Sequence, residues 1–564
     1  MPELVEYHCD IMNCKKTAIG YFVICDWCVK SHCNKHNVPK YHGCLKLDQT
    51  KTHEEARHAK LKVHAEAQVK YFGNLLEQLR QHERFIINEA QQLRPGCPCA
   101  LTVPMNVDAF VEANQNAGFN LHFNLNFDDG VKWLLRVRQN RGHRPPKEIA
   151  NTDISSEVAT LKVLREKGIP VPEAFFPPAL SNTDDNSAPP FDYFYYEFVN
   201  GNPCHLPREG YFGLIDLPDH RLHRFIDEYA KLQIRLSEIK LPYREIGCIY
   251  MNEADDQGLS SRTGPIVRRG CFMKPEPPYF FGPFSTNKER YLTHIDAALH
   301  YISINALQET QPIDEYLWHL EIRELVEASK VLSEKPDQLF IKHDDEKGDH
   351  LMVDDDGNIV GVIDWQWAYA TTKAEAFSPP FIFNRQAQFV FGGNNSLTRD
   401  ENILIACYER YDRPDLADCV RNGRLYLRLQ RIGQYDPVYQ KSGFREVFGD
   451  DIPKDFHPPA QDVDWRVYMM KRYKDHAGLS DLLQQHGWSI AKAEEKAKKW
   501  HTEEAEKKRQ KHLAKKKEKM DQKKREEQEL VKQVGDLTMD EVPIEVIPAI
   551  HASAVHEEHK NCTH

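Results

Sequence analysis

The chain has 564 residues, 41% of them hydrophobic, which is long enough for a sizeable buried core and for several domains. Its formal net charge of −11 argues against a general nucleic-acid binder, although this average hides local differences. No apolar run approaches the roughly 20 residues needed to cross a bilayer. Six of the 14 cysteines lie in the N-terminal segment, and the others are scattered apart from Cys97 and Cys99, as in a reducing compartment, so we expect a cytoplasmic or nuclear protein.

Residues 1–49 concentrate metal-binding side chains. Eight donors fall within 36 residues in four pairs, namely Cys9 with Cys14, Cys25 with Cys28, Cys33 with His36, and His42 with Cys44. Eight donors suffice for two tetrahedral zinc sites, and zinc would supply most of the folding free energy of so short a segment. A disulfide knot is the alternative. It is disfavoured because no signal peptide precedes the segment and because His residues fall in register with Cys.

The order of these donors resembles the stress-associated-protein (AN-one type) zinc finger. The resemblance implies two zinc ions in a cross-brace, one bound by Cys9, Cys14, Cys33 and His36, and the other by Cys25, Cys28, His42 and Cys44. Four residues separate the first two cysteines, where two are more usual, and His8 and His32 are spare donors. Such a finger also implies a protein partner.

Residues 50–100 are predicted to form a helical linker. The stretch 50–93 is rich in Glu, Lys, Ala, Gln and Leu, and the sequence Arg-Pro-Gly-Cys-Pro then breaks the helix. Apolar residues at helical spacing indicate that one side of this segment packs against another part of the protein. They are Val69, Phe72, Leu75, Leu76 and Leu79.

The next hundred residues alternate strand and helix signals. Two strand-like runs, 120–127 and 131–137, flank an Asp-Asp-Gly turn and predict a hairpin in which Arg136 faces away from its apolar neighbours. An N-cap at Asp153 and a Gly-x-Pro stop predict a helix of about fourteen residues. Glu157 shares the buried face of that helix, so its carboxylate requires a cationic partner. An aromatic strand, 191–199, ends in a turn.

Residues 201–490 are predicted to be mostly helical. Helical patterns occur near 220–236, 288–307, 316–332, 401–421 and 425–434. A Pro- and Gly-containing insertion, 247–284, lies between the first two, and no residue in these helices identifies a substrate.

Residues 340–367 carry the clearest chemical signal. Two apolar runs, 351–353 and 359–363, flank an Asp-Gly turn and predict a hairpin that brings Asp345 and Asp364 towards one site. Phosphoryl transfer requires one carboxylate to take a proton from the attacking hydroxyl and another to hold magnesium. The alternative is an ordinary acidic hairpin on the surface.

The sequence KHDDEKGDH, followed by Ile363-Asp364-Trp365, resembles the aminoglycoside phosphotransferase (choline kinase-like) family, and with the later AFSPP it resembles the fungal branch of that family. The resemblance implies an α+β, bilobal protein-kinase-like fold, with an N-lobe at 101–200 and a C-lobe at 201–490. It implies ATP and magnesium as cofactors, Asp345 and His343 as catalytic residues, and Asp364 as a metal ligand.

One position departs from that family. His350 stands where an asparagine oxygen usually reaches the second metal, although magnesium prefers oxygen ligands to imidazole. Either Asp349 supplies the missing oxygen, or one metal suffices, or the site binds nucleotide without turnover.

The same resemblance assigns residues upstream. Arg136 takes the place of the strand lysine that holds the nucleotide phosphates, and Glu157 becomes its helix partner. Backbone groups near Glu197 and Phe198 would contact adenine, and Gly118 lies in a glycine-poor phosphate loop. The alternatives are a surface arginine, a glutamate at the edge of the apolar stripe, and an aromatic strand without ligand.

Residues 491–534 form a charged segment with an excess of Lys and Arg over Asp and Glu, and too few apolar residues for a heptad seam. The pattern is typical of a solvated charged helix or of disorder, with RNA, ribosome or acidic-partner contact as the alternative. Residues 535–564 are predicted to be a flexible tail.

Two functions from different classes remain open. The first is an ATP-dependent phosphotransferase acting on a small hydroxyl compound or a protein. The second is a zinc-finger adaptor with a catalytically weak kinase-like body. Asp345, Asp364, Arg136 and Glu157 favour the first, whereas His350 and the glycine-poor loop favour the second.

Overall fold

The computed structural model describes residues 7–8, 17–18, 66, 69–113, 120–139, 147–178, 188–204, 219–252, 261–274, 276–307, 311–384, 389, 393–435 and 441–535. The eight predicted zinc ligands, Gly118 and residues 536–564 lie outside these ranges. Within them, no helix is both long enough and apolar enough to cross a membrane. The chain divides into two units, Met1–His457 with Tyr473–Leu483, and Pro458–Arg472 with Gln484–His564.

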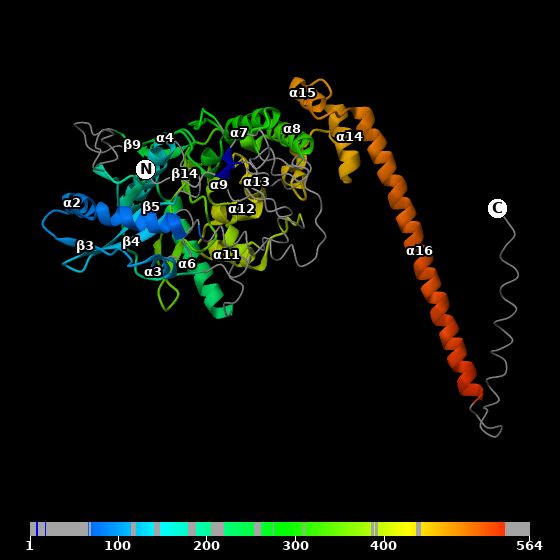
Figure 1. Ribbon diagram of the computed structural model, residues 1–564, viewed down its shortest axis with the longest axis horizontal. Coiled ribbons are helices and arrows are strands. Elements are labelled where there is room, and N and C mark those ends of the chain that lie inside the picture. The colour runs from blue at the N-terminus through cyan, green and yellow to red at the C-terminus, as the bar shows by residue number, and fades with distance from the viewer. Residues whose placement is uncertain are drawn as a thin grey trace. The chain divides into compact units, whose positions relative to one another are not determined.

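The first unit is a mixed helix and sheet structure that begins with a five-stranded antiparallel sheet (Figure 1). Its strands, in spatial order, are β3 (Cys99–Leu101), β4 (Asn120–Phe127), β5 (Lys132–Arg138), β7 (Tyr193–Glu197) and β6 (Ala174–Phe175). The predicted hairpin is present as β4 and β5, and Gly130 in its turn has a φ of 89°, which favours glycine.

The two faces of this sheet differ because side chains alternate along each strand. On one face, Leu125, Leu135 and Tyr195 are buried in a core with helical residues 69–81, α2 (Glu83–Leu93) and α3 (Val107–Ala113). The segment expected to link the finger to the lobe is therefore part of the lobe from residue 69 onward. Of its five predicted contact residues, Val69 alone is exposed.

Helix α4 (Lys147–Glu166) has 20 residues and starts six residues before the predicted N-cap, so the prediction of a fourteen-residue helix is wrong. Asp153 lies inside the helix, and its buried side chain contacts Arg138 and Gln366 instead of capping the backbone. Tertiary contacts thus override the local capping signal. The predicted apolar stripe is buried, and so is Glu157.

Among the described residues after 204, helices predominate over strands. The 401–421 pattern forms two helices, because Pro414 starts a second helix and Asp412 adopts a positive φ of 55°. The main helices are α6 (Asp219–Ser237), α7 (Asn287–Ser303), α8 (Pro312–Ala328), α9 (Lys373–Ala376), α11 (Arg399–Arg410), α12 (Pro414–Asn422) and α13 (Arg424–Leu429). The insertion contains the hairpin of β9 (Cys248–Met251) and β10 (Ser261–Gly264), followed by a 3-10 turn, Arg269–Met273.

Four short strands organise residues 340–371. β11 (Phe340–Lys342) pairs with β14 (Tyr369–Thr371), and the predicted hairpin of β12 (Leu351–Val353) and β13 (Ile359–Val362) lies between them in sequence. β12 also pairs with β8 (Asn202–Pro203), just after the sheet strand β7. Pairing of β11 with β14 therefore returns the chain so that the loops after β11 and β13 meet.

The second unit contains α14 (Asp462–Arg472) and α16 (Ile490–Gly535), while α15 (Ala477–Gln485) spans the boundary between the units. Helix α16 has 46 residues, so the charged segment is helical. Within this unit, His501 Nε2 lies 2.9 Å from Asp464 Oδ1, and Lys471 Nζ lies 2.6 Å from Glu494 Oε1.

Candidate active site

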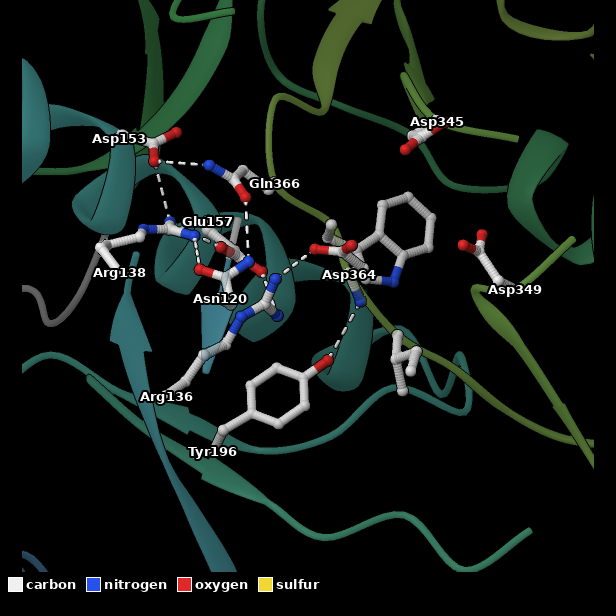
Figure 2. A network of polar contacts seen from close by, with 12 residues as sticks. Asn120, Arg136, Arg138, Asp153, Glu157, Tyr196, Asp345, Asp349, Asp364 and Gln366 are labelled. Atoms are coloured by element: carbon white, nitrogen blue, oxygen red, sulfur yellow. Dashed lines mark hydrogen bonds and ion pairs between the residues drawn. The ribbon is translucent and has the colours of Figure 1, made fainter. Parts of the chain in front are cut away.

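Arg136 and Arg138 share one face of β5, and their guanidinium groups form ion pairs with three carboxylates (Figure 2). Arg136 donates to Glu157 Oε1 at 2.9 Å and also forms an ion pair with Asp364. Arg138 donates to the second oxygen of Glu157 at 3.0 Å and to Asp153 Oδ2 at 2.9 Å. All except Asp364 are buried. Each buried charge therefore has a partner of opposite sign, which burial of a charge requires.

Two side-chain amides connect this network to neighbouring elements. Asn120 of β4 accepts from Arg138 and donates from Nδ2 to Gln366 Oε1 at 3.1 Å. Gln366, two residues after Asp364, donates in turn to Asp153 Oδ2 at 2.9 Å. The loop after β13 is thus hydrogen-bonded to both the sheet and α4 (Figure 2).

The backbone holds Asp364 in an unusual conformation. Its φ is 60°, in the left-handed region that costs a non-glycine residue about 1–2 kcal/mol. Its N–H donates to the Tyr196 hydroxyl at 3.2 Å, and its side chain remains 45% exposed. Partial burial tends to raise the pKa of Asp364, but the charge and the hydrogen bond of Arg136 outweigh this effect and lower the pKa to about 2. Asp364 is therefore a permanently ionised, accessible carboxylate.

His343 ties together the loops after β11 and β13. Its Nδ1 accepts the Asp345 N–H at 3.2 Å, so the ring proton is on Nε2, which donates to the Ile363 carbonyl at 3.1 Å. The ring also packs edge-on against Trp365, with centroids 4.9 Å apart. Both ring nitrogens are occupied, so the structure makes His343 a residue that positions Asp345 and Asp364.

Further buried contacts hold the loop His343–His350 from inside. Asp344 accepts from Arg268 of the insertion, at 3.1 Å from Nε and 2.7 Å from the terminal nitrogen. Glu346 accepts from Lys342 at 3.1 Å and from the Tyr229 hydroxyl at 3.0 Å. These anchors fix the loop backbone.

The other side of the loop presents charged groups to solvent. The side chains of Asp345, Lys347 and Asp349 are 36%, 33% and 40% exposed. Lys347 Nζ lies 2.7 Å from Asp345 Oδ2 and 3.6 Å from Asp349 Oδ2. Burial raises the pKa of Asp345, and the nearby carboxylates of Asp364 and Asp349 add to the rise while Lys347 opposes it. Figure 2 shows the carboxylates of Asp345, Asp349 and Asp364 around the same part of the site.

His350 is buried within the same loop. Its ring is buried and stacks on His343 with centroids 4.3 Å apart, while its Nδ1 accepts the Gly348 N–H at 3.3 Å. Burial lowers the pKa of His350 well below its usual value, so the ring is neutral. The assignment of His350 to the cofactor-binding positions, which comes from the family resemblance, therefore stays a prediction, and this residue lies buried against His343. The carboxylate nearest to it in sequence, Asp349, is exposed instead.

In the segment predicted to contact adenine, two backbone N–H groups already donate hydrogen bonds within the protein. The Glu197 N–H donates to the Glu173 carbonyl at 2.7 Å, and the Phe198 N–H donates to the Lys132 carbonyl at 3.0 Å. The next residue, Val199, packs against Gly361 of β13, where an added Cβ would come within 2.5 Å of its Cγ1. Neither of the first two N–H groups is therefore available to a ligand without losing a hydrogen bond.

Several contributors were missed at the sequence level. Arg138 has a detectable signal, because it lies two strand residues after Arg136 and shares its face. Asp153 likewise lies four helix residues before Glu157 and shares its face. Gln366 and the Arg268 anchor lie outside regular elements, so periodicity gives no signal for them. Among described residues, no cluster of three His, Cys, Asp or Glu side chains forms a metal site by itself.

Residues 120–371 match the model of a family described as "Phosphotransferase enzyme family". The match supports a phosphotransferase-family domain over this stretch, which contains all the site residues described above. No curated protein sequence matches the chain.

Three solved structures resemble the chain at low identity. An ethanolamine kinase from Plasmodium vivax is 13% identical, over 68% of this chain and 85% of that one, with a TM-score of 0.35. A macrolide 2'-phosphotransferase from Brachybacterium faecium is 11% identical, over 66% and 99%, with a TM-score of 0.30. A thermostable mutant of an aminoglycoside phosphotransferase, with ADP and hygromycin B, is 14% identical, over 71% and 98%, with a TM-score of 0.34.

The Glu157→Gln substitution should lower the free energy of unfolding by about 3 kcal/mol, because two buried arginines lose their shared carboxylate. Urea denaturation followed by tryptophan fluorescence measures the effect. Glu166→Gln, at the exposed end of the same helix, is the matched control and should change stability by less than about 0.5 kcal/mol. Equal effects of the two substitutions would contradict a stabilising role for the network.

The carboxyl group of Asp153 should make stability depend on pH. Burial raises the pKa of Asp153 from 3.8 to about 6, with Arg138 opposing and Glu157 adding to the rise. Between pH 4 and pH 6 the folded protein thus retains a proton that the unfolded chain has released, so this contribution to stability falls as the pH rises. The Asp153→Asn variant has no ionisable group at this position. Its free energy of unfolding relative to that of the wild type should therefore rise between pH 4 and pH 6, by about 2 kcal/mol. A pH-independent difference in denaturation free energy would show that Asp153 does not titrate there.

Proposed function

We propose that this protein is an ATP-dependent phosphotransferase that acts on a hydroxyl group. The observation that carries the proposal is the guanidinium of Arg136, which is held by Glu157 and contacts the accessible carboxylate of Asp364. Phosphoryl transfer depends on a cation for the phosphates, a carboxylate for magnesium and a base for the hydroxyl. Residues of these three types lie together here, within the stretch that matches the phosphotransferase family.

Arg136 is suited to bind the α and β phosphates of the nucleotide. A guanidinium is permanently charged, and its fork of N–H groups matches phosphate oxygens. Glu157 orients one end of the guanidinium from the buried side, and the other end now pairs with Asp364. Phosphates would take over that second contact and free the carboxylate of Asp364.

Magnesium fits the oxygen donors on the exposed side of the site. Asp364 and Asp349 offer side chains that are 45% and 40% exposed, and magnesium prefers oxygen ligands, with phosphates and water completing its shell. When bound, the ion would neutralise charge on the phosphates. Because the pKa of Asp364 is about 2, this ligand is ionised at any physiological pH.

Asp345 is the base in the proposed reaction. It accepts the proton of the substrate hydroxyl as that oxygen attacks the γ-phosphorus and ADP departs. Its raised pKa improves its basicity, and Lys347 brings a positive charge beside the transferred group. His343 positions Asp345 by accepting a hydrogen bond from the Asp345 backbone N–H at its Nδ1.

The elements around the site indicate where adenine and the phosphate acceptor would bind. With the Glu197 and Phe198 N–H groups engaged, Val199 and the carbonyls of this segment become the partners for adenine. The acceptor, a small molecule or a protein, would be selected by the helices after residue 204.

We further propose that residues 1–49 bind two zinc ions and recruit a protein, and that the domain belongs to the fungal branch of the family. In support of the finger, β1 (Tyr7–His8) pairs antiparallel with β2 (Thr17–Ala18), and Cys9 and Cys14 fall between these strands in the sequence.

The second candidate function is a nucleotide-binding scaffold with weak catalysis. The burial of His350 favours it, because that position contributes no oxygen to a second metal. Binding and turnover must therefore be measured separately.

Nucleotide binding by the full-length protein tests both candidates. ATP with Mg²⁺ or Mn²⁺ should raise the melting temperature, and Asp364→Ala should weaken metal-dependent binding at least about tenfold, because a ligand and a charge are lost. Asp355→Ala, in the exposed turn between β12 and β13, is the matched control and should bind ATP as the wild type does. Absence of metal-dependent binding in the wild type would contradict the proposal.

Turnover is measured as release of phosphate from ATP, in which water takes the place of the acceptor. Asp345→Asn should lower this rate about a hundredfold or more while leaving ATP affinity unchanged, because it removes the base and keeps the shape. Nucleotide binding without turnover in the wild type would favour the scaffold. An equal rate in Asp345→Asn would rule out this base.

A further inference from the structure

Residues 507–525 of α16, here the basic segment, have a charge opposite to that of the chain. They contain eleven Lys or Arg and two Asp or Glu, a net charge of +9, whereas the whole chain carries −11. Every side chain in the basic segment is exposed except that of Asp521, which is half-buried. The proposed phosphotransferase function makes no use of this charge.

Most of these cations form no ion pair with any residue that the structure describes. Lys507 lies 2.9 Å from Glu504, Arg509 lies 3.1 Å from Glu506, and Lys523 lies 3.8 Å from Glu527. Among the residues that the structure describes, no ion pair involves the other eight, which are Lys508, Lys511, Lys515, Lys516, Lys517, Lys519, Lys524 and Arg525. The positive charge of the basic segment is therefore left largely uncompensated.

Four lysines also form a continuous row, here the lysine ridge. Lys511, Lys515, Lys519 and Lys523 follow one another at four-residue spacing, so they lie along one face of the helix, where like charges repel. A bound polyanion would turn this repulsion into attraction and stabilise the helix. The ridge therefore indicates a densely charged anionic partner.

The basic segment lacks the features that a protein groove or a membrane surface requires. Both would engage an apolar stripe at helical spacing. The exposed large apolar residues here are Leu513 and Met520, 55% and 53% exposed, and lysines surround them. Binding would therefore be electrostatic, and phosphates of a nucleic acid have the required charge density.

The length and diameter of the basic segment indicate which kind of nucleic acid it can bind. Nineteen helical residues span roughly 28 Å, and a helix with its side chains is about 10–12 Å across, which matches the B-DNA major groove of about 12 Å. The major groove of A-form RNA is too narrow to admit it. The cations lie on all sides of the helix, so they can reach phosphates of both strands. Nine of the eleven are lysines, which act as point charges and carry little base specificity.

We propose that the basic segment of α16 binds duplex DNA through its phosphates, with the helix in the major groove and without sequence selectivity. The test is fluorescence anisotropy of a labelled 20-base-pair duplex titrated with full-length protein between 50 and 200 mM NaCl. Affinity should fall steeply with salt. The triple variant Lys511→Gln, Lys515→Gln, Lys519→Gln should bind at least about tenfold more weakly at 100 mM salt, with a salt slope reduced by about 3.

A matched control separates the ridge from overall charge. Lys167→Gln, Lys240→Gln and Lys335→Gln remove the same charge from exposed positions of the first unit and should leave binding unchanged. Glutamine is a good helix former, and circular dichroism checks that α16 persists. The single variant Lys515→Gln should lower the slope by about 1.

Four results would overturn the proposal. They are equal weakening by the ridge and control variants, no binding of the duplex at 50 mM salt, single-stranded RNA binding as tightly as the duplex, and polyglutamate binding as tightly as the duplex. The last result would point to an acidic protein partner.

Discussion

The guanidinium of Arg136 is the point at which three parts of the first unit meet. The side chain projects from β5, is 3% exposed, and joins Glu157 of α4 to Asp364 in the loop after β13. A buried charge without a partner costs several kcal/mol, so these elements cannot separate without leaving charge unpaired. The positions of the helix, the sheet and the loop therefore depend on one another through this side chain.

The loop His343–His350 shows how rigidity and accessibility are combined. Its buried side chains bind inward, Asp344 to Arg268 and Glu346 to Lys342, while Asp345 and Asp349 stay partly exposed. The inward contacts fix the backbone, and the carboxylates of Asp345 and Asp349, which lie beside Lys347, remain accessible to ligands. A charged group on a fixed backbone does not need to be reorganised when a reaction begins.

Sequence reasoning succeeded where periodicity carries the information. The hairpins β4–β5 and β12–β13 follow from strand-like apolar runs around turns that contain an Asp-Gly step, and the burial of Glu157 follows from the helical stripe. It failed where a contact distant in sequence decides the outcome. Asp153 has the local signal of a helix cap, but its partners lie on β5 and in the loop after β13. His350 stands where the family usually carries an asparagine ligand, and its ring is buried and stacks on His343.

The proposed reaction depends on a nucleotide and metal site formed by Arg136 and Asp364. The most direct measurement is a crystal structure of the protein with Mg²⁺ and a non-hydrolysable ATP analogue. We expect magnesium about 2.0–2.1 Å from a carboxylate oxygen of Asp364, with Arg136 on the phosphates and its contact with Glu157 retained. An analogue bound elsewhere, or one that leaves the ion pair between Arg136 and Asp364 intact with no metal on Asp364, would contradict it.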